Sequence, residues 1–198
     1  MKVGVTHIAL LRAINLGPHN KVAMSDLRGL LMNAGLREAQ TLLQSGNAVF
    51  RCDAAAAKLE PLLEAAAKKQ WGMAIEFFVR TAAQWQALIA ANPFTKEAAT
   101  DPGRLLVMFL KAAPAAGAVT ALRTAIKGRE TVEVNGREAY IVYPDGVGRS
   151  KLTIALIEQK LGTRATGRNW NTVTKLGKLA EGSSEKGNVR REKLEVRR

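Results

Sequence analysis

The sequence is poor in several features that would assign it to a class of protein. It has one cysteine, Cys52, so no intramolecular disulfide can form, and we expect a reducing, cytoplasmic setting. Aromatic residues make up 5% of the 198 residues, so Ala, Leu and Val must supply most of the core. No apolar run approaches the roughly 20 residues that a membrane-spanning helix needs, and we therefore expect no membrane partner.

The sequence also lacks residue patterns that indicate catalysis or metal binding. The two histidines, His7 and His19, belong to no cluster with metal-ligand spacing, so we expect no metal site and no cofactor. Ser45 has no histidine near it in the sequence, and Cys52 at the end of a predicted strand is typical of an inert buried thiol. No catalytic residue can be assigned, and the sequence leaves open whether the protein is an enzyme.

Positive charge is what the sequence has in excess. The formal net charge is +13. Residues 103–182 carry 13 basic and 6 acidic side chains, against 11 and 8 in residues 1–102. Such an excess favours binding of polyanions such as nucleic acid. The alternative interpretation is a solvated basic surface without a specific partner.

The spacing of apolar residues predicts the same order of elements twice. The first set is a strand over 7–12, a helix over 25–34, strands over 40–44 and 48–52, a helix over 58–71, a strand over 74–80 and a helix over 81–91. The second set is a strand over 105–110, a helix over 116–126, strands over 131–134 and 138–143, a helix over 150–161, a strand over 164–170 and a helix over 172–179. Asn135-Gly136 is a strong hairpin signal.

This order is β-α-β-β-α-β followed by a helix, which is the ferredoxin-like order. We therefore predict an α+β fold of two tandem ferredoxin-like halves, one over 1–96 and one over 103–181, related by duplication. Residues 183–198 are polar and basic without a sustained apolar period, which predicts a disordered tail.

Polar residues are expected to converge at one sheet edge of the first half. The first two strands run parallel through a helical crossover, so the loop after the first strand and the turn between the second and third strands are neighbours. The polar residues of these segments are Arg12, Asn15, Lys21, Gln44, Ser45 and Asn47. A guanidinium beside several amides can hold an anion. The alternative is structural, since Asn and Ser commonly satisfy backbone groups in turns.

A second polar edge is expected in the second half, at the opposite end of its sheet. Its residues are Arg149, Ser150, Lys151, Arg168, Asn169 and Trp170. A helix beginning near Ser150 would present free N–H groups between two basic side chains, an arrangement that suits a phosphate or sulfate. The structural alternative has Arg168 and Trp170 bridging the two halves.

Short motifs spread over residues 5–180 carry a family resemblance. They are Ala9–Gly17, Lys21–Met24 with Leu27-Arg28, Gln44–Phe50, Asn92–Phe94, Ser150–Leu152, and Arg168–Val173 with Lys175-Leu176. Together they resemble a bacterial family catalogued as domain of unknown function 1697. The chain departs from the family pattern at Ala13 and Pro18, where glycine is usual, and at Leu42, where an aromatic residue is usual. The resemblance implies a two-part ferredoxin-like α+β architecture and no catalytic residues.

Three functions remain open at this point. The first is a nucleic-acid-binding protein that acts mainly through phosphate contacts, although the stacked aromatics of RNA-recognition motifs are missing and only Tyr140, Tyr143 and Trp170 could serve as platforms. The second is a protein that binds, or an enzyme that acts on, a small anionic metabolite. The third is an interaction or scaffold protein without a ligand.

Overall fold

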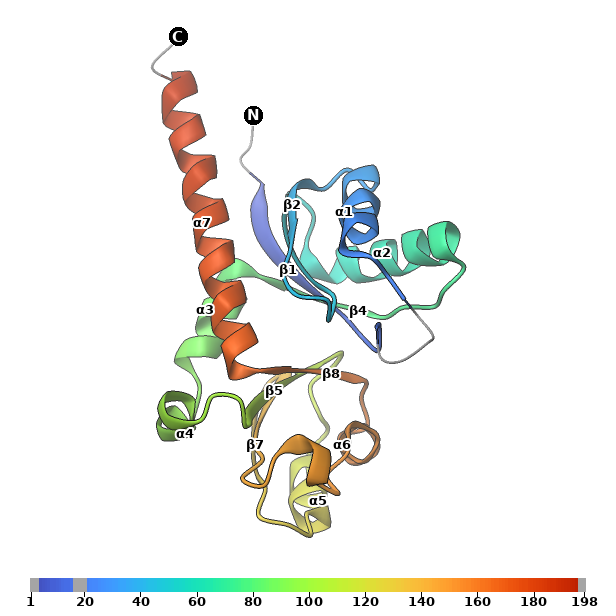
Figure 1. The fold of residues 1–198 in the computed structure, drawn as a ribbon, viewed down its shortest axis with the longest axis vertical. Helices are drawn as coiled ribbons and strands as arrows, with labels where there is room; N and C mark the ends of the chain where they lie inside the picture. The colour runs from blue at the N-terminus through green and yellow to red at the C-terminus, as the bar shows by residue number, and fades with distance from the viewer. Residues whose placement is uncertain (1–3, 16–20, 196–198) are drawn as a thin grey trace. The chain divides into compact units, whose positions relative to one another are not determined.

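A computed structural model describes residues 4–15 and 21–195, with residues 184–195 described by their backbone alone (Figure 1). The chain forms an α+β fold with two compact units. The first comprises Met1–Ala87 and Lys175–Arg198, and the second comprises Leu88–Thr174. Each unit contains a four-stranded antiparallel sheet. The predicted halves covered residues 1–96 and 103–181. The boundaries between the two units of the structure instead fall after Ala87 and after Thr174.

The first unit has four strands and two helices between them. Its elements are β1 (Val5–Leu11), α1 (Met24–Asn33), β2 (Arg37–Thr41), β3 (Asn47–Cys52), α2 (Ala56–Trp71) and β4 (Phe77–Thr81), followed by α3 (Ala82–Ala90), which continues into the second unit. The strand order is β2-β3-β1-β4. The expected order of elements is confirmed.

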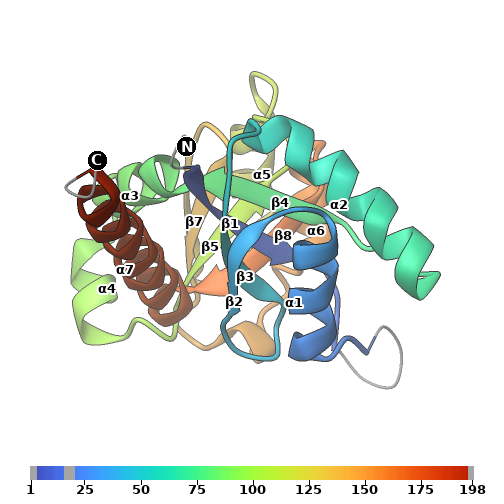
Figure 2. The same ribbon diagram turned by 90° about the horizontal axis from the view of Figure 1, so that it is seen from above.

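Alternation along the strands explains which face of this sheet the helices cover. Ala9 and Leu11 of β1 and Phe50 of β3 point to one face, because successive side chains of a strand point to opposite sides. Both α1 and α2 lie on that face (Figures 1 and 2). Each helix contributes apolar residues at helical spacing, namely Leu27, Leu30 and Leu31 from α1 and Leu59, Leu63 and Ala67 from α2.

The second unit repeats this arrangement. Its elements are α4 (Thr95–Thr100), β5 (Leu105–Leu110), α5 (Ala118–Ala125), β6 (Thr131–Asn135), β7 (Glu138–Val142), a 3₁₀ turn over Val147–Arg149, α6 (Ile154–Leu161) and β8 (Ala165–Asn169). The strand order is β6-β7-β5-β8. The core joins Met108, Leu110 and Ile141 of the sheet to Leu122 of α5 and Ile157 of α6.

The helix predicted to begin at Ser150 begins four residues later, so this prediction is wrong. Helix α6 begins at Ile154, and Thr153 caps it by accepting a hydrogen bond from the Leu156 N–H at 3.3 Å. Ser and Thr are both favourable at the N-cap. The Ser150 hydroxyl instead accepts a hydrogen bond from the Leu152 N–H at 2.9 Å.

The last helix is longer than predicted. Helix α7 runs from Trp170 to Glu195, so it covers most of the segment expected to be a disordered tail. Glu, Lys and Arg favour helix once a helix has begun, so a polar and basic composition does not exclude one. Residues 196–198 lie outside the described residues, as do Pro18 and His19.

Within the first unit, the later part of α7 is attached to the sheet through Ser183. The Arg51 Nη1 of β3 donates to the Ser183 carbonyl oxygen at 2.9 Å, and the Gln40 Nε2 of β2 donates to its hydroxyl at 3.1 Å. Arg51 and Ser183 are both buried. Of the helices in the described part of the chain, none combines the length and the apolar composition that crossing a bilayer requires.

Candidate functional site

The polar residues of the first unit meet at one edge of its sheet. In the register of β1 and β3, Leu10 lies opposite Asn47. The Leu11 N–H donates to the Gly46 carbonyl oxygen at 2.8 Å, and the Arg12 N–H donates to the Glu76 carbonyl oxygen at 3.0 Å. Arg12 and Asn47 therefore lie at the same edge, as the crossover argument predicts.

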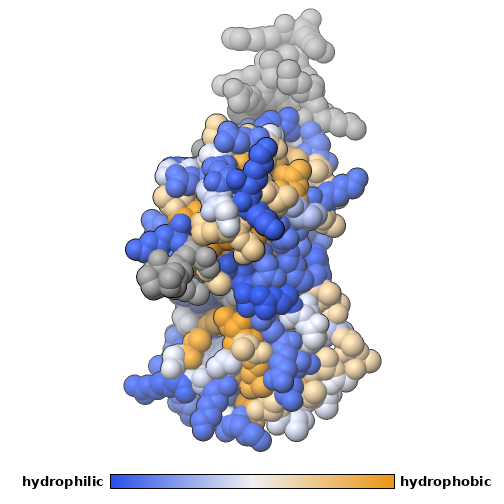
Figure 3. Space-filling view, turned by 90° about the vertical axis from the view of Figure 1, so that its right-hand side faces the viewer, coloured by the Kyte–Doolittle hydropathy of each residue, from blue (hydrophilic) through white to orange (hydrophobic). Residues whose placement is uncertain are grey.

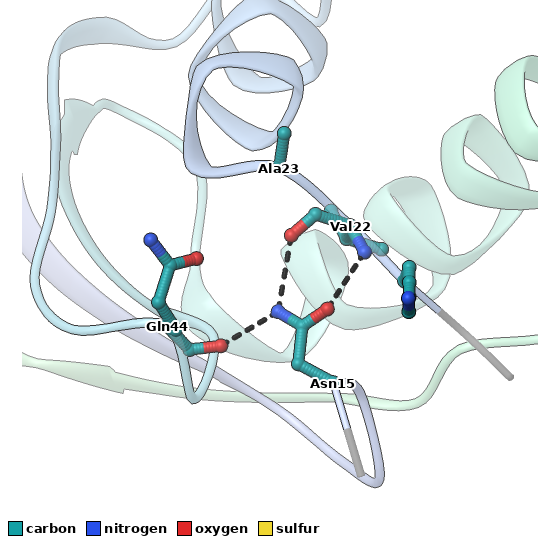
Figure 4. Close-up of a pocket in the computed structure, with 5 residues that line it drawn as sticks. Asn15, Val22, Ala23 and Gln44 are labelled. Atoms are coloured by element: carbon teal, nitrogen blue, oxygen red, sulfur yellow. Dashed lines mark hydrogen bonds between the residues drawn. The ribbon is translucent and has the colours of Figure 1, made fainter. Parts of the chain in front are cut away.

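A pocket of about 380 Å³ lies at this edge, and we call it the amide pocket (Figure 4). It is lined by Asn15, Lys21, Val22, Ala23 and Gln44. The Asn15 amide is used within the protein, because its Oδ1 accepts from the Val22 N–H at 2.9 Å while its Nδ2 donates to the carbonyl oxygens of Val22 at 3.0 Å and Gln44 at 2.7 Å. Its backbone has a φ of +56°, which Asn tolerates better than most residues. Asn15 thus builds the pocket, and Lys21 and Gln44 are its exposed polar side chains.

The other three residues predicted for this edge do not line the pocket. The Arg12 guanidinium forms an ion pair with Glu76, with 3.5 Å between Nη1 and Oε2. Asn47 is fully buried, and its Nδ2 donates to the Leu42 carbonyl oxygen at 2.7 Å and to the Ser45 Oγ at 3.0 Å. Asn47 and Ser45 therefore shape the β2–β3 turn, which supports the structural interpretation for these two residues.

The polar loops of the second unit also leave one edge of their sheet. Val142, the last residue of β7, lies opposite Leu105, and Asn169, the last residue of β8, lies opposite Leu106. The strands β5 and β6 begin at this same edge, since Thr131 of β6 also lies opposite Val142. Residues just before β5 and β6 are therefore neighbours of the loop after β7.

Two arginines that sequence reasoning missed reach this loop from those positions. Arg129 precedes β6 and binds Asp145 through two donors on one edge of its guanidinium. Its Nε donates to Oδ2 at 3.1 Å, and its Nη2 donates to Oδ1. Arg104 precedes β5, donates to the Pro144 carbonyl oxygen and pairs with Asp101, with 2.9 Å between Nε and Oδ2. The signal was available in the topology, because strand beginnings and strand ends share an edge in an antiparallel sheet.

The charges of three arginines act on Asp145. The hydrogen bond from Arg129 lowers the pKa of the Asp145 carboxyl most, desolvation opposes this, and the charges of Arg129, Arg104 and Arg149 each lower it further. The same hydrogen bond raises the pKa of Arg129. We call Arg104, Arg129 and Arg149 the arginine cluster. Each of the three side chains is exposed to solvent.

Ser150 and Lys151 follow the cluster in the chain and differ in role. The Ser150 hydroxyl donates to a Glu130 carboxylate oxygen and accepts from the Leu152 N–H, so it connects the loop to the residue before β6. Lys151 is exposed. Neither Arg149 nor Lys151 forms an ion pair with any residue that the structure describes. The helix N-terminus expected between these two residues lies after both of them, because Thr153 caps α6 and the helix begins at Ile154.

Arg168, Asn169 and Trp170 have structural surroundings. Arg168 is buried, and its Nη1 donates to the Thr166 hydroxyl at 3.1 Å and to the Gly167 carbonyl oxygen at 2.8 Å. Desolvation lowers the pKa of Arg168 to about 10. The Asn169 Oδ1 accepts from the N–H and the hydroxyl of Thr172 at 3.0 and 2.9 Å, which caps the beginning of α7. Trp170 is 8% exposed.

The aromatic residues that could have served as stacking platforms are buried. Tyr140 and Tyr143 are 1% and 2% exposed, and their hydroxyls donate to the carbonyl oxygens of Leu88 at 2.7 Å and Leu152 at 3.2 Å. Desolvation, reinforced by the charge of Glu138, raises the pKa of Tyr140 to about 12. These rings cannot stack on a base while they remain in the core.

Metal binding finds no support in the part of the chain that the structure covers. Among those residues, no three His, Cys, Asp or Glu side chains lie together in a group that could hold a metal ion. Cys52 is a partly buried free thiol, and its Sγ accepts a hydrogen bond from the Ala54 N–H at 3.4 Å.

Comparison with known proteins places the chain in a family. Residues 5–140 match the model of a family described as protein of unknown function (DUF1697). The chain belongs to this family. The matched range includes the amide pocket, Arg104 and Arg129, and it ends before Asp145 and Arg149.

A solved structure has a similar fold. It is that of the conserved bacterial protein SP0830 from Streptococcus pneumoniae, which is 22% identical, with a TM-score of 0.71 over 89% of this chain and 98% of that chain. At this identity the likeness concerns the fold alone. None of the curated proteins matches this DUF1697 member.

Proposed function

We propose that the protein binds nucleic acid through phosphate contacts made by the arginine cluster. The observation that carries this proposal is that Arg129 pairs with Asp145 and Arg104 donates to the carbonyl oxygen of the adjacent Pro144, so two arginines from separate segments meet the loop that carries Arg149. Arg149 and the neighbouring Lys151 form no ion pair with a described residue, so their charge is available to a ligand. Guanidinium groups pair with phosphate oxygens in well-defined geometry.

A local cluster is a stronger argument than the net charge. Hydrophilic side chains are spread over much of the face of the molecule in Figure 3, with apolar groups between them. A net charge of +13 that is not gathered in one place would attract any polyanion weakly. Arginines held at one sheet edge provide a definite place for a phosphate.

The proposed binding depends on phosphate rather than on base identity. Tyr140, Tyr143 and Trp170 are buried, so stacking on bases contributes nothing in this arrangement. Contacts to three or four phosphates release counterions, and the logarithm of the affinity for single-stranded RNA should fall with the logarithm of salt concentration with a slope of about −2 to −3. We expect little discrimination between sequences.

Fluorescence anisotropy with a short labelled single-stranded RNA tests the proposal. Arg129→Glu should weaken binding at least tenfold at low salt, because it places a carboxylate inside the cluster. Arg123→Glu is the matched control: Arg123 is an exposed arginine of the same unit, paired with Glu133 at 2.7 Å. Equal losses in the two variants, or no binding by the unaltered chain at the lowest salt, would contradict the proposal, and the latter result would favour a scaffold without a ligand.

A second candidate function rests on the amide pocket. We propose as the alternative that this pocket binds, or takes part in a reaction of, a small anionic metabolite. Lys21 supplies the positive charge, Gln44 supplies an amide, and Asn15 holds the two loops together. A thermal-shift screen over nucleotides, sugar phosphates and acidic metabolites tests this, with Lys21→Ala expected to abolish any shift and Lys58→Ala, an exposed lysine of α2, as the control. Uniformly flat responses would contradict it.

We further propose that each sheet with its two helices is a ferredoxin-like unit, that the units arose by duplication and that the protein works in the cytoplasm. The orders β2-β3-β1-β4 and β6-β7-β5-β8 are the same when counted from the first strand of each unit, which supports the first two proposals. A single cysteine supports a reducing compartment.

A further inference from the structure

The pairing of Arg129 with Asp145 has the geometry of a bound phosphate. Two donors of one guanidinium, Nε and Nη2, meet two oxygens of one acidic group. Carboxylate and phosphate oxygens both accept this two-point pairing. The position that a nucleic-acid phosphate would occupy on Arg129 therefore already holds the chain's own carboxylate.

We propose that Asp145 is an internal competitor for the arginine cluster, so that a phosphate group of a nucleic acid must displace its carboxylate to bind Arg104, Arg129 and Arg149. This inference rests on the proposed function. It adds that Asp145, which pairs with a member of the arginine cluster, lowers the affinity of the cluster for phosphate. The ligand class is a phosphate group with at least two accessible oxygens, such as the phosphodiester of a single strand.

The surroundings of Asp145 allow such an exchange. The side chains of Arg129 and Asp145 are 69% and 57% exposed, and exposed ion pairs are weak because water screens them. The backbone on either side is held by other contacts. The Tyr143 N–H donates to the Arg104 carbonyl oxygen at 2.9 Å, and Ser150 is bonded to Glu130. The Asp145 carboxylate can therefore turn away by side-chain rotation while the arginines keep their positions.

The charges around Asp145 indicate which arginines could bind a phosphate once its carboxylate has turned away. The Arg129 hydrogen bond lowers the Asp145 carboxyl pKa most, desolvation opposes this, and the charges of Arg129, Arg104 and Arg149 lower it further, so all three arginines act on the same carboxylate. Of the three, Arg104 keeps a carboxylate partner in Asp101. Removing the Asp145 charge releases Arg129, which can then bind a phosphate together with Arg149.

The experiment compares Asp145→Asn with Glu133→Gln. Each change removes one negative charge from an exposed carboxylate that pairs with an arginine of the second unit, and the two carboxylates have similar exposures of 57% and 51%. A general electrostatic effect would therefore be equal in the two variants. We expect Asp145→Asn to bind the labelled RNA roughly three- to tenfold more tightly than Glu133→Gln, because it also releases Arg129.

A double variant tests the mechanism. In an Arg129→Gln background, Asp145→Asn should increase the RNA affinity no more than Glu133→Gln does, because the Arg129 guanidinium that Asp145 would release is absent. Thermal unfolding of each variant checks that the fold is kept.

Each result of this series has a distinct meaning. If the unaltered chain does not bind RNA, both the proposed function and this inference fail. If Arg129→Glu weakens binding more than Arg123→Glu but Asp145→Asn binds no more tightly than Glu133→Gln, the proposed function stands and the inference is overturned. Weaker binding by Asp145→Asn would also overturn it, since Asp145 would then organise the arginines rather than compete for them.

Discussion

The polar edges of the two units differ in what their side chains are bound to. At the edge of the first unit, the side-chain amides of Asn15 and Asn47 form hydrogen bonds with backbone carbonyl and N–H groups of the surrounding loops. At the edge of the second unit, Arg104 and Arg129 extend into solvent and bind exposed acidic groups or a loop carbonyl. Two sheets with the same strand order thus carry different chemistry. Function has to be argued from loop residues, since the strand order alone does not distinguish the edges.

The comparison predicts that changes at the first edge cost stability, whereas changes at the second edge cost binding. The four predictions below are ordered by the expected change in the free energy of unfolding, from the largest to the smallest.

Gly46→Ala should be the most damaging of these substitutions. Gly46 has a φ of +72°, and a Cβ there would lie 2.6 Å from the Ile14 Cδ1 and 2.8 Å from the Leu11 Cβ. The left-handed backbone and the overpacking together should cost about 2 to 5 kcal/mol in urea unfolding. The matched control is Gly136→Ala in the other hairpin, where φ is +57° but nothing lies within 4 Å of a Cβ, and the cost should be about 1 kcal/mol. Equal costs would show that packing at the first edge is looser than described.

Asn15→Ala should follow, with a loss of about 1 to 3 kcal/mol. It removes the hydrogen bonds to Val22 and Gln44 and leaves an alanine at a φ of +56°. Gln44→Ala, which alters an exposed side chain of the same pocket, should change the unfolding free energy by less than about 0.5 kcal/mol. A similar loss in both variants would mean that Asn15 is not the residue that connects the loops.

His7 should make stability depend on pH. It is buried, stacked on Phe50 with 5.7 Å between ring centroids, and desolvation lowers its pKa below the ordinary 6.5 even though the Val5 carbonyl opposes this. The unfolded chain then takes up the proton first, so stability is full above pH 6.5 and falls as the pH drops towards the folded-state pKa. Urea midpoints at neutral pH and at about pH 5 measure this. His7→Gln should remove the dependence in that window, and a dependence that persists in His7→Gln would refute the assignment.

Arg129→Gln should have the smallest effect on stability. An exposed ion pair contributes little, so the unfolding free energy should change by less than about 0.5 kcal/mol, while RNA affinity should fall several-fold. The pKa of the Asp145 carboxyl should rise, because the hydrogen bond that lowers it is lost. NMR titration of Asp145 measures this, with Arg123→Gln as the control that leaves its pKa unchanged. A large loss of stability would place Arg129 among structural residues.

The order of the elements could be predicted from the sequence because it depends on local signals. Apolar spacing located the strands and most of the helices, although α4 was not predicted, and the crossover rule placed Arg12 and Asn47 at one edge, which the pairing of Leu10 with Asn47 confirms. The Asn135-Gly136 hairpin was also predicted correctly, with Gly136 at a φ of +57°.

What could not be predicted depends on contacts between distant segments. The sequence does not reveal that Asn15 reaches Val22 and Gln44, since this requires a positive φ that only the folded loops stabilise. It does not decide between Ser150 and Thr153 as the cap of α6, because both residue types suit the position. Arg104 was overlooked because it stands before a strand rather than after one.

The path of α7 has a consequence for the synthesis of the chain. The first unit contains both an early segment, up to Ala87, and a late one, from Lys175 onward. The buried guanidinium of Arg51 finds its acceptor on Ser183 only after the whole of the second unit has been translated. On the ribosome, therefore, the first unit is completed only after the second unit has been synthesised.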